Sequence, residues 1–222
     1  RVARPFGAIT HKILESAGTS IMLVPAHEQS INADMFASKH YNTILIPLDG
    51  SRRAECVLPI ADRLAKEQKA KLVLAHVLQR PDVLSWAMLA DDTRKLTEHF
   101  VEHIGSVAQS YLDQIHERQD NDTVCILAQA DNVAIELDHI AAQYEVDLML
   151  ISAHGAAANP MRSFGDTVGG ILNYCRGPIL IYQDRPAAHT IEPESAPIRE
   201  RIARQNDHSS LTGTAGTQQT YI

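Results

Sequence analysis

The chain of 222 residues carries a formal charge of −7 and 45% hydrophobic residues, which is ordinary for a globular protein of one or two domains. The acidic balance argues against nonspecific nucleic-acid binding, which needs a concentrated basic face, and no apolar run approaches the roughly 18 residues of a membrane helix. No secretory signal is visible and the cysteines lie far apart, so we expect a cytoplasmic protein with buried, reduced thiols and neither a membrane nor a nucleic acid as partner.

Five short apolar runs predict β-strands, in chain order, at residues 42–48, 71–77, 123–128, 146–152 and 178–182. Between them, apolar residues recur at helical spacing, which predicts helices from residue 51 onward, along 96–115, along 133–144 and along 168–175. Continuously apolar strands that alternate with helices are typical of a parallel sheet covered on both faces. We therefore predict an α/β fold with an open, doubly wound sheet of five parallel strands over residues 41–183.

Two of the predicted helices have features of their own. Pro59 interrupts the first one, so we expect an irregular or kinked start. His99 and His103 on the long helix have the i, i+4 spacing of a metal pair, but a solvated helix face explains them better, and we predict no metal site. The apolar stripe of the long helix predicts one buried face, formed by Leu96, Phe100, Ile104, Val107, Tyr111 and Ile115.

The two ends of the chain differ from its middle. Residues 184–222 are rich in Pro, Ser, Thr, Gly and charge, and cannot bury enough apolar surface to offset the entropy of ordering. We expect them to form a disordered tail. The chain opens with Arg1 rather than Met, which leads us to expect a piece of a longer protein.

The first residues repeat the last helix and strand. Residues 3–24 align without gaps on residues 161–182, with identities at Arg4, Phe6, Gly7, Ile13, Leu14 and Ile21. We predict that residues 1–24 are the end of a preceding copy of the domain, and that a linker over 25–40 joins them to the complete copy. Since an isolated helix and strand cannot bury their apolar faces, they should dock on the rest of the first copy or on the sheet edge of the second.

A long loop follows the fourth predicted strand. The strand ends at Ser152, Gly155 follows, and nine residues separate it from Gly165, where the last helix is about to begin. Glycines let backbone N–H groups approach phosphate oxygens closely, and a helix N-terminus adds a favourable field. The loop either wraps a phosphate chain or only connects two elements.

Several segments resemble the universal stress protein family: "PLDGS" at 47–51, "LAHV" at 74–77, "DLMLISAHG" at 147–155, Gly165, and "PILIY" at 178–182. The resemblance covers residues 41–183, with 1–24 as a fragment. It implies a sheet like that of the adenine-nucleotide alpha hydrolases and a tandem of two domains. Family members pair through the edge of their last strands, here with a second domain in cis or in a homodimer. Many bind ATP, others are regulatory modules, and some are reported to phosphorylate themselves.

The family's nucleotide motif resembles Gly-x-x-Gly, nine residues, then Gly followed by Ser or Thr. Gly155 and Gly165 match it, whereas Ser152 and Asp166 depart from it. Ser152 adds a hydroxyl that could crowd the ligand or bond to it. Asp166, at or near the N-cap of the last helix, satisfies the N–H groups that a phosphate would use. It also repels phosphate, by about 4 kcal/mol for unit charges about 4 Å apart at an effective dielectric constant near 20, unless Mg²⁺ bridges the two.

The other expected contacts lie at the carboxyl ends of the strands, where open α/β sheets bind ligands. The resemblance gives Pro47, Leu48 and Asp49 contacts with adenine and ribose, and Val77 a contact with adenine. Asp49 also suits a turn, with Ser51 capping the next helix. His154 either touches a phosphate or is exposed to solvent, and Thr167 offers a displaced hydroxyl in place of the missing one.

These observations favour a non-catalytic universal stress module that binds an adenine nucleotide, with either ATP, and Mg²⁺ beside it, or no cofactor. The alternative is a dimerisation or interaction module that has lost ATP binding because of Ser152 and Asp166. An enzyme that hydrolyses ATP or phosphorylates itself is a third class with less support. No nucleophile elbow is visible, and we assign no catalytic residue.

Overall fold

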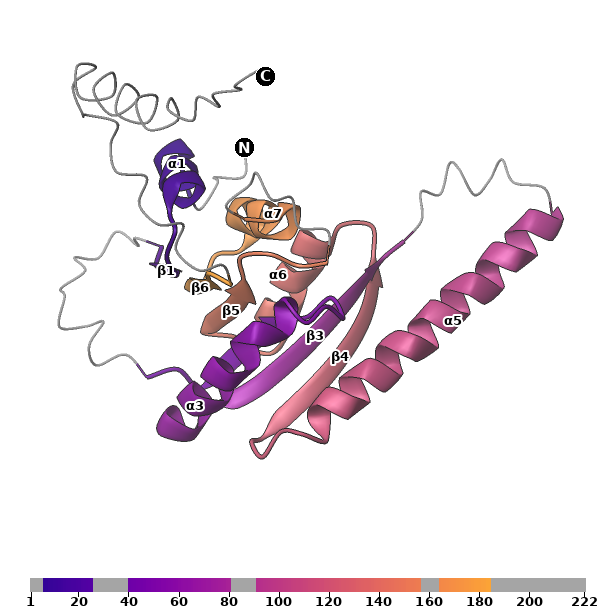
Figure 1. Ribbon diagram of the computed structural model, residues 1–222, viewed down its shortest axis with the longest axis horizontal. Helices are drawn as coiled ribbons and strands as arrows, with labels where there is room; N and C mark the ends of the chain where they lie inside the picture. The colour runs from indigo at the N-terminus through magenta and orange to yellow at the C-terminus, as the bar shows by residue number, and fades with distance from the viewer. Residues whose placement is uncertain (1–5, 26–39, 81–90, 157–163, 185–222) are drawn as a thin grey trace, which may run out of the picture. The chain divides into compact units, whose positions relative to one another are not determined.

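The computed structural model describes residues 6–25, 40–80, 91–156 and 164–184, and they include one mostly parallel sheet (Figure 1). Its six strands have the order β1-β6-β5-β2-β3-β4. They are β1 (Ile21–Leu23), β2 (Thr43–Pro47), β3 (Lys71–Gln79), β4 (Thr123–Ala130), β5 (Leu148–Ser152) and β6 (Ile179–Tyr182). All neighbours are parallel except β1 and β6. The five predicted parallel strands are therefore confirmed, and β1 adds an antiparallel sixth.

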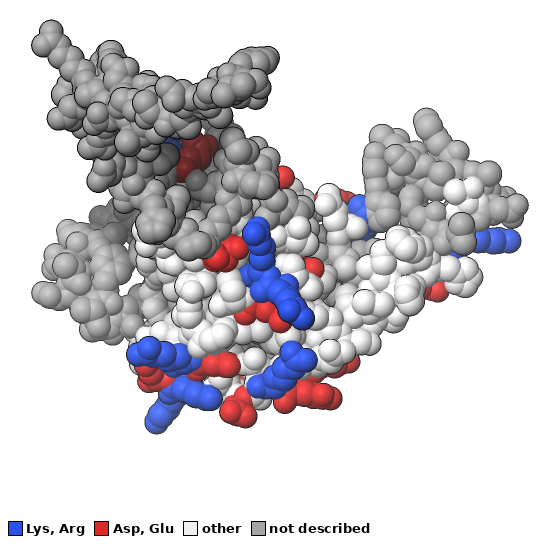
Figure 2. Space-filling model, in the orientation of Figure 1, with Lys and Arg blue, Asp and Glu red and all other residues white. Residues whose placement is uncertain are grey.

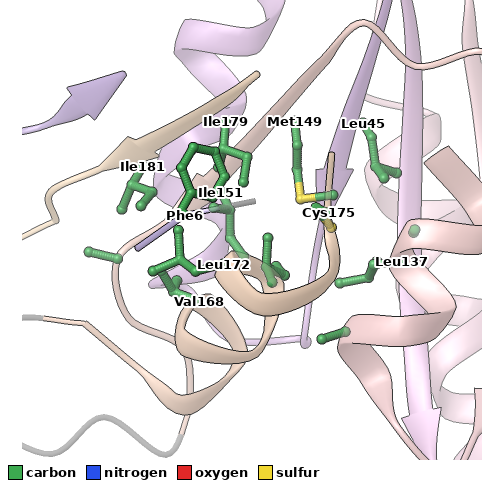
Figure 3. Packing of buried hydrophobic residues seen from close by; sticks show 14 of the residues in the cluster. Phe6, Leu45, Leu137, Met149, Ile151, Val168, Leu172, Cys175, Ile179 and Ile181 are labelled. Carbon is green, nitrogen blue, oxygen red and sulfur yellow. The ribbon is translucent and has the colours of Figure 1, made fainter. Parts of the chain in front are cut away.

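Helices cover both faces of the sheet, as predicted for a doubly wound fold. Successive strand residues point to opposite faces, so Leu45 and Val73 belong to a cluster with α6 (Val133–Gln143) and α7 (Asp166–Tyr174). Ile44 and Leu74 belong to a second cluster, with η1 (Ala54–Val57), α3 (Leu58–Gln68) and α5 (Asp91–His116). Figure 3 shows the first cluster, in which Phe6, from the N-terminal segment, lies with Ile151 and Ile179.

The irregular helix start predicted from Pro59 is present. A 3₁₀ turn, η1, leads into α3, and Pro59 lies in the first turn of α3. An N–H in that turn has no partner within the helix, so proline is tolerated there.

The buried face predicted for the long helix is correct only in part. Of the predicted residues, Ile115 is buried and Tyr111 is partly buried, but Phe100, Ile104 and Val107 are exposed. Leu112, which the prediction did not include, is fully buried. The 26 residues of α5 span about 39 Å, whereas the eight residues of β4 span about 26 Å. The helix is therefore longer than the strand beside it, and its apolar stripe extends beyond the end of the sheet.

The N-terminal segment docks on the edge of the sheet, one of its two expected partners. It contains α1 (Ala8–Ser16), whose ends each lie 158 residues before those of α7, at Asp166 and Tyr174. In the antiparallel pairing of β1 with β6, Met22 faces Leu180, and the pairs on either side are Ile21 with Ile181 and Leu23 with Ile179. Under the same offset Ile21 corresponds to Ile179 and Leu23 to Ile181, so the register is symmetric about the central pair.

The remaining expectations about the chain ends fall largely outside what the structure covers. Residues 26–39 of the linker predicted over 25–40, and residues 185–222 of the tail predicted over 184–222, lie outside the described residues. Asp184 is described and its side chain is buried against His154, so the expectation of disorder is wrong for the first residue of that tail. No helix in the described ranges combines the length and the apolar character needed to cross a membrane.

Candidate functional site

A cavity with a volume of about 200 Å³ lies at the carboxyl ends of β2, β3 and β5, beside the N-terminus of α7. Strand β2 pairs with β3 on one side and with β5 on the other, so the chain order reverses at this point. Such a switch point is where open α/β sheets bind ligands. The cavity is lined by all ten predicted binding residues, Pro47, Leu48, Asp49, Val77, Ser152, His154, Gly155, Gly165, Asp166 and Thr167.

Sequence reasoning missed the apolar wall of this cavity. Ala75, Leu137, Ile151 and Val168 line it, and all four belong to the core cluster under α6 and α7. Ala75 could have been found, because it lies two residues before Val77 and therefore shares its face of β3. The position of Leu137 depends on how α6 packs on the sheet, which the local pattern does not give.

Asp49 joins the two sides of the cavity. Its Oδ1 accepts hydrogen bonds from the backbone N (3.0 Å) and Oγ (2.6 Å) of Ser51, which is the turn that the sequence predicts. Ser51 Oγ in turn accepts from the N–H of Ala54 at the start of η1. Asp49 Oδ2 reaches across and accepts from the N–H of Ala156, at 2.7 Å. Burial raises the pKa of Asp49, but these hydrogen bonds outweigh burial and hold that pKa below its ordinary value.

Gly155 is required by this bridge. A Cβ atom built on Gly155 would overlap Oδ2 of Asp49. The sequence explains the glycine by the approach of a phosphate, whereas the described contact is the approach of a carboxylate. At Gly165 an added Cβ would meet only the carbonyl oxygen of Ala153, at an ordinary 3.7 Å.

The hydroxyl of Ser152 lies away from the cavity's apolar wall. Ile151 belongs to the cluster under α6 and α7, so the next side chain, that of Ser152, points to the opposite face of the sheet. There its Oγ lies 3.5 Å from Sγ of Cys56 in η1 and 3.4 Å from the backbone N of His154. Burial raises the pKa of the Cys56 thiol, which therefore donates to the serine. We infer that the departure at Ser152 is compatible with a ligand.

His154 is buried, so the expectation that it is exposed to solvent is wrong. Its side chain has 0% exposure, and Nδ1 lies 2.5 Å from Oδ1 of Asp184, whose side chain is 5% exposed. Because a carboxylate only accepts, Nδ1 carries the hydrogen. The other oxygen of Asp184 lies 3.6 Å from Nε of Arg53, at the start of η1. Sequence reasoning missed both Asp184 and Arg53.

The last predicted contacts surround the first turn of α7. Gly165 is the N-cap, in extended conformation, and its N–H donates to the carbonyl of Ala153 at 2.7 Å. Asp166 is the first helical residue, and both Asp166 and Thr167 are exposed. N–H groups of a first turn have no acceptor within their helix, and their field favours an anion. The carboxylates of Asp49 and Asp166 repel an anion at this end of the cavity. No Lys or Arg occurs among the described residues that line the cavity to offset that repulsion.

Other candidate groups lie elsewhere. A second cavity of about 440 Å³ borders Asp138, Cys175 and Arg176 and contains none of the predicted site residues. Burial raises the pKa of Cys175 to about 12, and Cys56 and Cys125 are half-buried free thiols, so the expectation of buried, unpaired cysteines holds fully only for Cys175.

The last observations concern the long helix and one face of the molecular surface. His99 and His103 are both exposed, as a solvated helix face requires. The described residues contain no group of three or more side chains that could hold a metal ion. Figure 2 shows acidic and basic side chains interleaved over the described part of one face, without a broad basic surface there.

The fold and the cavity together define a doubly wound α/β protein with a candidate binding site at the switch point of its sheet. The model of the universal stress protein family matches residues 40–183, well over half of the chain. The chain belongs to the universal stress protein family. None of the curated proteins compared with it matches.

Solved structures share the fold at low sequence identity. The universal stress protein UspA from Lactobacillus plantarum has a TM-score of 0.57 and 15% identity, over 65% of this chain and 99% of its own. The hypothetical protein MJ0577 has a TM-score of 0.53 and 17% identity, over 67% of this chain and 99% of its own. PA1789 from Pseudomonas aeruginosa PAO1, of unknown function, has a TM-score of 0.57 and 11% identity, over 95% of this chain and 64% of its own.

Proposed function

We propose that the chain is a cytoplasmic, non-catalytic stress-response module that binds an adenine nucleotide at the switch-point cavity. The observation that carries the proposal is that residues from separate parts of the sequence, around Asp49, at Val77, at 152–156 and at 165–167, line one cavity. The stress role comes from membership of the family.

The lining divides into parts that suit different parts of a nucleotide. Ala75, Val77 and Leu137 form an apolar wall, on which a flat base can pack. Asp49 lines the cavity with a carboxylate, to which a ribose hydroxyl can donate. Thr167 and the first-turn N–H groups of α7 suit phosphate oxygens.

Asp166 sets the condition under which ATP would bind. Its carboxylate repels a phosphate chain, and none of the lining residues described supplies a compensating cation. A Mg²⁺ ion between Asp166 and the phosphates would turn that repulsion into an attraction. ATP binding should therefore depend on Mg²⁺, and a nucleotide with fewer phosphates should bind with less dependence on it.

The described cavity does not favour catalysis. The hydroxyl of Ser152 lies next to Cys56, and Nδ1 of His154 is hydrogen-bonded to Asp184. No pair of described lining residues therefore combines a nucleophile with a free neighbouring base, which covalent catalysis needs.

Calorimetric titration with ATP, with and without Mg²⁺, tests the proposal. The protein should bind ATP with Mg²⁺, and Asp166→Ser should strengthen Mg²⁺-free binding about tenfold, equivalent to about 1.4 kcal/mol. Asp131→Asn is the matched control, because Asp131 is an exposed carboxylate that pairs with Arg80 and lies outside the cavity. Absence of binding in all three proteins would contradict the proposal, and phosphate release over time would favour an enzyme.

The second candidate function is an interaction module, and the N-terminal segment favours it. The matching ends of α1 and α7 and the symmetric register of β1 with β6 are what a pair of equivalent domains would give. Ile171 of α7 is fully buried, whereas its counterpart Ile13 on α1 is 54% exposed, next to Ile9 at 76%. We propose that residues 1–24 end a first universal-stress-type domain, whose sheet would cover Ile9 and Ile13.

That partner could come from the same polypeptide or from a second copy. Strand β6 already has β5 and β1 on its two sides, so a second copy has no free β6 edge to pair with. Sedimentation velocity over a range of concentrations tests the homodimer, with Ile13→Lys as the disruptive variant and Lys12→Ala as the control. Association that Ile13→Lys abolishes would support it, and a monomer at every concentration would exclude the homodimer.

A further inference from the structure

Two consecutive residues after β6 reach in opposite directions. The backbone N of Gln183 donates to Oγ of Ser20 at 3.0 Å, and its Nε2 lies 3.5 Å from the carbonyl oxygen of Ala17. Asp184 contacts His154 at 2.5 Å and Arg53 at 3.6 Å. One dipeptide therefore holds the N-terminal segment with one residue and the walls of the cavity with the other.

Asp184 contacts His154, which lines the cavity, and Arg53, which directly precedes the lining residue Ala54. His154 directly precedes Gly155 and Ala156, the loop residues against which Asp49 packs. Arg53 is the N-cap of η1, four residues after Asp49. The loop at 154–156 is thus held twice to the segment 49–53, through Asp49 and through Asp184.

The Asp184 contact is the better shielded of the two. The side chains of His154 and Asp184 are 0% and 5% exposed, whereas Asp49 as a whole is exposed. A buried charged group that loses its partner is strongly destabilised, so the carboxylate and the imidazole should move together. A displacement of the chain after β6 would be passed directly to the loop that begins at His154.

We infer that Asp184 is a positioning residue that couples docking of the N-terminal segment on β6 to the geometry of the cavity. Residues 17–23 do not line the cavity, yet they fix Gln183, and Gln183 fixes the backbone of Asp184. The consequence for a ligand rests on the proposed nucleotide function. Since coupling between two sites is reciprocal, a nucleotide in the cavity should also tighten the β1–β6 edge.

Amide hydrogen exchange of the full chain, resolved by NMR, tests the coupling without any ligand. The reporter is the N–H of Ala156, which donates a hydrogen bond to the carboxylate of Asp49. Asp184→Asn should speed exchange at residues 153–156 about tenfold, because it removes the buried anion that holds His154. Ser20→Ala, which lies outside the cavity, should speed exchange at Gln183 and, to a smaller extent, at residues 153–156.

Two control variants isolate the effect. Asp131→Asn removes an exposed carboxylate just after β4, and Thr19→Ala changes the exposed neighbour of Ser20; both should leave residues 153–156 unchanged. The inference would be overturned if Asp184→Asn left the exchange rates at residues 153–156 within about twofold of the parent's. It would also be overturned if Ser20→Ala sped exchange at Gln183 but left the rates at residues 153–156 unchanged.

A titration of the same variants with ATP and Mg²⁺ separates this inference from the proposed function. Ser20→Ala should weaken ATP binding about three- to tenfold, within the usual range of coupling between sites. If the parent protein binds no ATP, the nucleotide proposal fails, and the exchange data alone decide the coupling.

Discussion

At the scale of single residues, the contact between Asp49 and Gly155 determines the shape of the cavity. The carboxylate leaves the end of β2 and accepts the N–H of Ala156, and Gly155 leaves room for it. Asp49 lies in the segment "PLDGS" and Gly155 in the glycine motif, and their contact gives each of them a role before any ligand binds. We therefore expect substitutions at these positions to change stability as well as binding.

Glycine substitutions test the close approach. Gly155→Ala should lower the free energy of unfolding by about 1–2 kcal/mol, because a Cβ atom displaces Asp49 from its hydrogen bonds. Gly165→Ala should change it by less than about 0.5 kcal/mol, since the added Cβ makes an ordinary contact at a backbone φ of −79°. Urea denaturation measures both, and equal losses would contradict the role given to Gly155.

The lowered pKa of Asp49 predicts a dependence on pH. A carboxyl group with a lower pKa in the folded state stabilises the fold above its unfolded pKa, near 3.9, and this contribution is lost as pH falls through the folded pKa. Asp49→Asn should therefore be less stable than the parent at pH 6, and the difference should shrink towards pH 3. Thermal unfolding across this range measures it, and a difference that does not vary with pH would argue against the carboxylate bridge.

The ten residues expected at the site, several of them from the family resemblance, all line the cavity, but the sequence predicted neither their contacts nor the apolar wall beside them. Strand ends were readable because the apolar runs end within two residues of the observed strands. The pairing of His154 with Asp184 joins positions 30 residues apart, and no local sequence pattern predicts it. A signal was nevertheless present, because Asp184 follows β6 and the carboxyl ends of neighbouring parallel strands meet at one edge.

At the scale of secondary-structure elements, the two ends of α5 differ in how they pack. The periodicity predicts one continuous apolar face, and periodicity cannot say where the sheet ends. Phe100 is 62% exposed and Leu112 is fully buried, although both are large apolar residues on one helix. The burial of each depends on whether β4 still runs beside the helix.

Truncation at these two positions tests the difference. Leu112→Ala should lower the free energy of unfolding by about 2–4 kcal/mol, because it opens a cavity in a packed core. Phe100→Ala should change it by less than about 0.5 kcal/mol. Similar losses measured by urea denaturation would mean that the exposed half of α5 is also packed in solution.

At the scale of the whole molecule, the N-terminal segment belongs to the same sheet and core as the matched domain. Strand β1 extends the sheet, Phe6 and Leu14 are buried in the cluster under α6 and α7, and Gln183 bonds to Ser20. The sequence predicts a docked remnant of an earlier repeat, but it leaves open which partner the remnant docks on. Strand β6 decides this, because β5 covers one of its sides and β1 pairs with the other, which would otherwise be an unpaired edge.

Integration of the N-terminal segment predicts cooperative unfolding. Phe6→Ala should destabilise the whole domain by about 3 kcal/mol, because Phe6 is 6% exposed within the core cluster. Ile9→Ala, at 76% exposure, serves as the control. A Phe6→Ala variant that loses only the N-terminal segment in hydrogen exchange, and keeps the parent's unfolding transition, would contradict a single unit.

The central claim is that the switch-point cavity takes an adenine nucleotide, and NMR mapping of ATP with Mg²⁺ onto the backbone amides tests it most directly. The account predicts that the largest shifts occur at Asp49, Val77, Gly155 and Thr167, which line the cavity from three parts of the chain. Shifts gathered instead around Asp138 and Arg176 at the second cavity, or no shifts at saturating ATP, would contradict it.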